Sequence, residues 1–171
     1  LSRITTPEQW AHAKEVLIAS AQRLEAGGAT ALMIAANSMH KVAEEIAAAI
    51  SIPILHIVDE TGEKMKADGI KATAVIGTRN VTTEPWFRQR LVRHGLTLAP
   101  YDTARVDEID RIIYEELMLG KVTESSRRTM KTFITDIAKQ DIQAIVLACT
   151  ELVMLVDADA NVLPIYDTTR I

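Results

Sequence analysis

The single cysteine of this 171-residue chain, Cys149, stands at the point where an apolar run ends. Its segment "AIVLACTE" (residues 144–151) is typical of a short buried strand followed by a helix that begins at Thr150 and Glu151. A thiol beside a helix N-terminus meets the positive end of the helix dipole, which favours the thiolate and lowers the pKa. Cys149 is therefore a candidate base or nucleophile. The alternative is a buried cysteine that only fills space as a small hydrophobic residue.

A second segment, "ALMIAANS" (residues 31–38), has the same pattern of an apolar run that ends in polar residues. Alignment of the two segments matches Ala36 with Cys149, Asn37 with Thr150 and Ser38 with Glu151. One copy thus carries a thiol where the other carries a methyl group. We interpret the two strand ends as an internal repeat.

A third strand end, "IGTRN" (residues 76–80), offers a glycine and a hydroxyl group. Gly77 would let a ligand approach the backbone, and Thr78 could donate to a carboxylate or a phosphate, although an ordinary turn has the same composition. Neither GxGxxG nor GxxxxGK[ST] is present, so the chain lacks the usual dinucleotide and P-loop fingerprints. We expect His56 to be a core or interface histidine rather than a catalyst, and His40 to be structural or solvated.

The elements around these strand ends predict an α/β fold with mainly parallel sheets. Thr6 and Pro7 open a long amphipathic pattern that stops at Gly27 and Gly28, as expected of a helix. Short, continuously apolar strands then alternate with helical segments of ten or more residues. Ligands of open parallel sheets bind beyond the carboxyl ends of the strands, where all three polar segments lie.

Composition and charge exclude several other classes of protein. The net charge of −4 comes without a basic patch, so we expect no nucleic-acid partner. One cysteine excludes an internal disulfide, and the four histidines are scattered without metal-ligand spacing. No apolar stretch approaches the roughly 20 residues of a membrane span, and we expect a reducing, cytoplasmic setting. Because the chain begins with Leu1 and ends soon after "VLPIYD", we expect it to be part of a longer one.

Taken in order, the motifs of this chain resemble the aspartate/glutamate racemase family, in particular the aspartate racemase branch. The matching segments are "NSMHKVAEEI", "PILHIVDETG", "VIGTRN" followed by "WFRQRL", "IIYEELMLGKVTESSR", "ACTEL" and "VLPIYDTTRI". The resemblance implies two pseudo-symmetric Rossmann-like or flavodoxin-like domains, with the active site in the cleft between them. We expect residues 1–52 and 162–171 to form the first, incomplete domain and residues 53–161 the second.

The resemblance also implies an isomerase that uses neither pyridoxal phosphate nor any other cofactor or metal. In such racemases two residues face opposite sides of the substrate Cα, and one removes a proton while the other returns one. The expected substrate is a small acidic amino acid such as aspartate or glutamate, and the expected assembly is a homodimer.

By the family pattern, Cys149 is one of the two acid/base residues. Substrate binding is expected to involve the following residues: Asn37, Ser38 and Thr150 for the carboxylate, Glu151 for the ammonium group, and Thr78 lining the cleft.

The chain departs from the family pattern at the other acid/base position, where Ala36 replaces the usual cysteine or threonine. Ala36 has no exchangeable proton, so we expect racemisation by this chain to be impaired, either by mutation or by nature. The alternatives are that water or a neighbouring hydroxyl replaces the missing group, that the chain is a one-cysteine decarboxylase or isomerase of dicarboxylic acids, or that it only binds an acidic metabolite.

Overall fold

A computed structural model describes residues 3–157 and 161–171, and in it the chain divides into two compact units, Leu1–His56 and Ile57–Ile171. Residues 1, 2 and 158–160, which the expected domain boundaries include, lie outside the described residues. All strand pairs among these described residues are parallel. The prediction of an α/β fold with mainly parallel sheets is thus confirmed.

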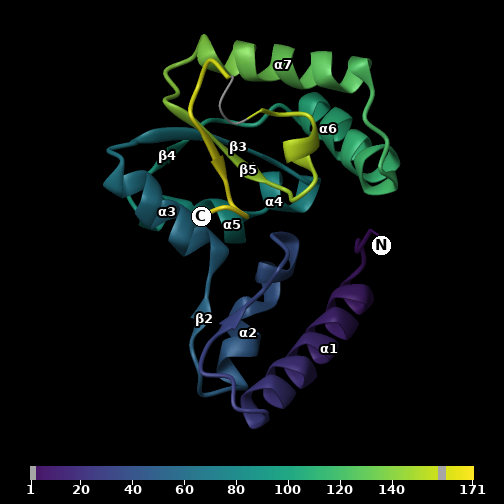
Figure 1. Cartoon of the computed structure of the whole chain (residues 1–171), viewed down its shortest axis with the longest axis vertical. Helices are drawn as coiled ribbons and strands as arrows, with labels where there is room; N and C mark the ends of the chain where they lie inside the picture. Colours follow the sequence, from purple (N-terminus) through teal and green to yellow (C-terminus); the bar gives the residue numbers. More distant parts are fainter. Residues whose placement is uncertain (1–2, 158–160) are drawn as a thin grey trace. The chain divides into compact units, whose positions relative to one another are not determined.

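The first unit consists of a long helix, a two-stranded sheet and a short helical return (Figure 1). Its elements are α1 (Pro7–Ala26), β1 (Leu32–Met33), the 3₁₀ helix η1 (Ser38–Val42), α2 (Ala43–Ala48) and β2 (Ile54–Leu55). Helix α1 begins as predicted, because the Thr6 hydroxyl accepts from the Gln9 backbone N–H and the Gln9 side chain accepts from the Thr6 N–H. Ala21, Leu32, Val42 and Ile46 form the buried core of this unit.

The second unit is built around a four-stranded sheet with the strand order β4-β3-β5-β6. Its strands are β3 (Ala72–Gly77), β4 (Thr97–Leu98), β5 (Ala144–Ala148) and β6 (Ile165–Asp167). Its helices are α3 (Ile57–Ala67), α4 (Arg79–Thr83), α5 (Pro85–Arg93), α6 (Thr103–Glu115) and α7 (Glu124–Ala138), with the 3₁₀ helices η2 (Leu117–Leu119) and η3 (Leu152–Met154).

Helices cover both faces of this sheet. Side chains along β3 and β5 point alternately to the two faces, so they contribute to two separate core clusters. Ile76 and Leu147 pack with residues of α6 and α7 on one face, whereas Val75 and Val146 pack with residues of α3 and α5 on the other (Figure 1). Every residue of β5 is buried, as the continuously apolar segment predicts for a central parallel strand. The central strands are therefore buried up to their carboxyl ends.

Two predictions about the elements differ from the structure. The sequence predicts a strand over residues 30–36 that is covered on both faces, but β1 contains only Leu32 and Met33, and Met33 is 78 % exposed. A turn follows at once, since the Ala36 N–H donates to the Ile34 carbonyl at 2.8 Å.

The expected assignment of residues 162–171 to the first domain also differs from the structure. β6 pairs with β5 along Ile145↔Ile165 and Leu147↔Asp167, so this segment belongs to the second unit. The reason is local packing, because Tyr166 lies in the core cluster of α3 and α5 and its hydroxyl donates to Asp68 at 2.6 Å.

Within residues 3–157 and 161–171, every helix is too short or too polar to cross a membrane. In the same part of the chain, no group of three or more histidine, cysteine, aspartate or glutamate side chains is placed to hold a metal ion.

Candidate active site

The Cys149 thiol lies directly after β5 and is held by the side chain of Glu151. Cys149 is only 6 % exposed, and its Sγ donates a hydrogen bond to Glu151 Oε2 at 3.1 Å. The Thr150 hydroxyl donates to the same carboxylate oxygen at 2.6 Å. The three predicted residues thus form one small cluster, in which a thiol and a hydroxyl both point at one carboxylate.

This environment favours the protonated thiol. Burial raises the pKa of Cys149, and the hydrogen bond to Glu151 together with the negative charges of Glu151 and Asp110 raises it further. Burial opposes ionisation of Glu151 as well, but the hydrogen bonds from Thr150 and Cys149 lower the pKa of this carboxyl group overall. At neutral pH the pair is therefore a thiol and a carboxylate.

The sequence-based prediction of a lowered thiol pKa is wrong for this structure. It assumed that Thr150 and Glu151 begin an α-helix, but the segment forms only the three-residue 3₁₀ helix η3, Leu152–Met154. One short turn offers little helix dipole, and burial beside a carboxylate outweighs it.

The end of β3 lies beside the end of β5. Gly77 pairs in register with Ala148, so Thr78 and Cys149 are the next residues of two adjacent strands, which run about 4.8 Å apart in parallel sheets. Gly77 allows this approach, because a Cβ atom there would lie 2.9 Å from the Ala148 carbonyl oxygen. Thr78 is buried, and its hydroxyl donates to Asn80 Oδ1 at 2.6 Å. The structure therefore brings Thr78 and Cys149 to one edge of the sheet.

Two further polar groups lie at this edge, and sequence reasoning missed them. The buried Asp110 carboxylate accepts the Arg79 backbone N–H at 2.7 Å, and the Thr168 hydroxyl after β6 donates to the Leu147 carbonyl at 3.0 Å. The sequence could have indicated Asp110, because at helical spacing it lies on the same side of α6 as the apolar residues Val106, Ile109 and Ile113, which are buried. A carboxylate within an apolar stripe indicates a specific polar contact.

The second strand end, Ala36–Ser38, belongs to the first unit and forms a turn into η1. His40 donates from Nδ1 to the Ala36 carbonyl at 2.8 Å, and the His40 and His56 rings meet edge to face with centroids 4.5 Å apart. Asn37 is buried and its carbonyl accepts the His40 backbone N–H at 3.1 Å, while Ser38 is the first residue of η1. The two histidines therefore shape the backbone around Ala36, in keeping with the structural role predicted for them.

The chain is similar to known racemases in sequence and in structure. The profile of the Asp/Glu/Hydantoin racemase family matches residues 1–171. The broad specificity amino-acid racemase RacX of Bacillus subtilis (strain 168) is 27 % identical over 158 residues, which are 91 % of this chain and 67 % of RacX.

Two solved structures share the fold closely. A Yersinia pestis protein assigned as an Asp/Glu racemase superposes with a TM-score of 0.88 and 37 % identity, over 95 % of this chain and 71 % of its own. An aspartate racemase homologue from Pyrococcus horikoshii OT3 superposes with a TM-score of 0.82 and 26 % identity, over 95 % of this chain and 72 % of its own. Family profile, sequence relative and fold agree, and the chain belongs to the Asp/Glu/Hydantoin racemase family of isomerases.

Proposed function

We propose that this chain acts on an acidic amino acid, aspartate or glutamate, by moving the Cα proton without a cofactor. Cys149 is the acid/base on one face of Cα, and position 36 is the corresponding place on the other face. The observation that carries the proposal is the hydrogen-bonded pair of Cys149 and Glu151 at the end of β5, in a chain of this racemase family.

The polar groups around the thiol suit a zwitterionic diacid. Glu151 is an ionised carboxylate that receives the substrate ammonium group, while the hydroxyls of Thr78 and Thr150 bind a carboxylate, together with Asn37 and Ser38 of the first unit. Binding of the ammonium group offsets the charge of Glu151, which removes one of the causes that raise the Cys149 pKa. Substrate binding thereby favours the thiolate that the reaction needs.

The thiolate then takes the Cα proton, and the electron pair that it leaves is delocalised into the hydrogen-bonded substrate carboxylate. Inversion requires a second proton donor on the opposite face, and the methyl group of Ala36 cannot supply one. Return of a proton from Cys149 regenerates the original enantiomer. The chain as it stands therefore exchanges the Cα proton of one enantiomer and inverts it slowly.

The presence of only one cysteine favours a second candidate function, a one-thiol decarboxylase or isomerase of dicarboxylic acids. In such a reaction a single proton delivery suffices, and Ala36 would need no partner group. Incubation with small dicarboxylic acids and analysis of the products separates this candidate from the racemase.

The experiment that tests the proposal is Cα exchange in deuterium oxide. We expect L- or D-aspartate or glutamate to lose its Cα proton signal in the presence of the chain, and the Cys149→Ala variant to lose this activity by roughly 10²-fold or more. Equal exchange by both proteins, or none of either amino acid by the parent chain, would contradict the proposal.

We also infer that the protein is a homodimer and works in the reducing cytoplasm, where its thiol stays free. Light scattering on the purified protein tests the first statement, and a monomer at every concentration would oppose it. Microscopy of a tagged full-length protein tests the second, and fluorescence outside the cytoplasm would oppose it.

A further inference from the structure

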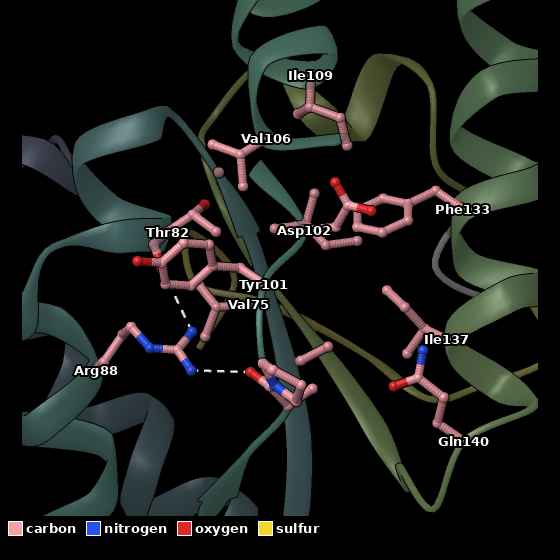
Figure 2. A pocket seen from close by; sticks show the side chains of 15 residues that line it. Val75, Thr82, Arg88, Tyr101, Asp102, Val106, Ile109, Phe133, Ile137 and Gln140 are labelled. Atoms are coloured by element: carbon pink, nitrogen blue, oxygen red, sulfur yellow. Dashed lines mark hydrogen bonds between the residues drawn. The ribbon is translucent and has the colours of Figure 1, made fainter. Parts of the chain in front are cut away.

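A cavity lies in the second unit beside β3 and the segment that follows the edge strand β4, and its lining does not include Cys149. It has a volume of about 80 Å³ and lies between β3, the segment that follows β4, and helices α6 and α7. Figure 2 shows Val106 and Ile109 above it, Phe133 and Ile137 on the right, and Arg88 and Thr82 on the left. The cavity is thus mostly apolar, with a cation and a hydroxyl on one side.

Arg88 is the cation, and in the part of the chain that the structure describes its guanidinium contacts neutral groups. Nη2 donates to the Ala99 carbonyl at 2.8 Å, Nη1 donates to the Thr82 carbonyl at 3.4 Å, and the group lies 5.4 Å from the centre of the Tyr101 ring (Figure 2). Within residues 3–157 and 161–171, no carboxylate forms an ion pair with Arg88. Burial lowers the pKa of this guanidinium, which reflects the cost of holding its charge away from water.

Thr82 supplies a second donor at the same cavity. Its side chain is only 3 % exposed, and its hydroxyl oxygen has no hydrogen-bond partner in the described part of the chain. A buried hydroxyl without a partner is uncommon, because it loses its bonds to water without compensation. Arg88 and Thr82 therefore both line the cavity, and each has hydrogen-bond donors that are not all bound by groups of the described chain.

Among the described residues, Asp102 is the one carboxylate that lines the cavity, and it accepts hydrogen bonds from other groups. Asp102 is exposed, and its Oδ1 accepts the backbone N–H groups of Ala104 at 2.8 Å and Arg105 at 3.2 Å as the N-cap of α6. It does not pair with Arg88, so the guanidinium charge is left for another anion.

We propose that this cavity binds a small monocarboxylate, whose oxygens accept from Arg88 and Thr82 and whose alkyl chain contacts Val106 and Ile109. A planar guanidinium suits a carboxylate, and the apolar walls suit a hydrocarbon chain. The volume is about half that of the ~150 Å³ cavity known to hold benzene, which fits a chain of about three or four carbons. None of the residues proposed to bind the acidic amino acid takes part, so the inference stands apart from the proposed function.

The test uses butyrate as the probe and the methyl NMR signals of Val106, Ile109 and Ile137 as the readout. We expect saturable shifts of these methyl groups with butyrate and none with the neutral amide, butyramide. Thr82→Val, which keeps the side-chain shape, and Arg88→Gln should each weaken butyrate binding by roughly tenfold or more. A saturating concentration of aspartate should not displace butyrate.

Several results would overturn the inference. They are the absence of saturable shifts in the parent chain, equal affinity for butyramide, unchanged affinity in the Thr82→Val variant, or displacement of butyrate by aspartate. If Arg88→Gln does not fold, Thr82→Val and the comparison with butyramide still decide the question. Equal shifts from inorganic phosphate would also overturn it, since phosphate has no alkyl chain to place against Val106 and Ile109.

Discussion

The Cys149 thiol donates a hydrogen bond to the Glu151 carboxylate at 3.1 Å, two residues along the same chain. This contact stabilises the protonated sulfur and keeps the carboxylate ionised, so the unliganded chain holds its only thiol in an unreactive form. An added positive charge at Glu151 would release that restraint.

The first prediction concerns the reactivity of the thiol. Replacement of Glu151 by glutamine removes a negative charge but leaves an oxygen that can accept from Cys149, so the pKa of the thiol should fall. We expect Glu151→Gln to react with iodoacetamide several-fold faster than the parent chain at pH 8, with similar burial of the sulfur. Mass spectrometry of the alkylated chain gives both rates. A slower or equal rate in the variant would show that Glu151 does not restrain the thiol.

The second prediction concerns stability at alkaline pH. The pKa of Cys149 is raised in the folded chain, whereas the pKa of a cysteine in an unfolded chain is about 8.5. Above this pH the folded chain therefore keeps a proton that the unfolded chain loses. The contribution of the protonated Cys149 thiol to the free energy of unfolding is complete below pH ~8.5 and falls as the pH rises above that value.

The Cys149→Ala variant isolates this effect from the other groups that titrate at high pH. We expect the free energy of unfolding of the parent chain to decline relative to the variant by up to about 1.4 kcal/mol per pH unit above pH ~8.5. Urea titrations at several pH values measure the difference. A difference that stays constant up to pH 10 would mean that the folded thiol titrates normally.

The third prediction separates the charge of Asp110 from its hydrogen bond. Asp110→Ala leaves the Arg79 N–H without its acceptor and should cost about 1–3 kcal/mol of stability, whereas Asp110→Asn keeps an acceptor and should cost less. Both variants remove a negative charge that raises the Cys149 pKa, so both should speed alkylation. Equal stability of the two variants would show that the contact with Arg79 has little effect.

The fourth prediction concerns the close approach of β3 and β5. A methyl group at residue 77 would lie 2.9 Å from the Ala148 carbonyl oxygen, so Gly77→Ala must push the strands apart beside Thr78 and Cys149. We expect a loss of about 1–3 kcal/mol of stability, measured by thermal or urea unfolding. Adding Ala148→Gly should not restore it, because the carbonyl oxygen remains. Full restoration would show that the Ala148 methyl group is the obstacle instead.

Features that depend on neighbouring residues were predictable from the sequence. Helix α1 begins where Thr6 and Pro7 predict, and the apolar segment of β5 is a buried central strand, because capping and hydrophobic patterning act within a few residues. The adjacency of Thr78 and Cys149 also follows from the rule that parallel strands end at one edge.

Features that depend on tertiary packing were not predictable in the same way. The raised pKa of Cys149 depends on burial and on how the Glu151 side chain turns back, and β6 joins the second unit because Tyr166 packs there. Asp110 is hard to single out from the sequence, because opposite charges at helical spacing are typical of a solvated helix face, whereas Asp110 itself is buried in the structure.

The proposed function requires that residue 36 and Cys149 act on opposite faces of one substrate carbon. The most direct test is to return a proton donor to residue 36 and to measure inversion and Cα exchange together. We expect Ala36→Cys or Ala36→Thr to convert exchange without inversion into racemisation of aspartate or glutamate, with inversion increased by roughly 10²-fold or more over the parent chain. Chiral chromatography of reactions run in deuterium oxide gives both quantities. Variants that fold normally but neither exchange nor invert either amino acid would contradict the account.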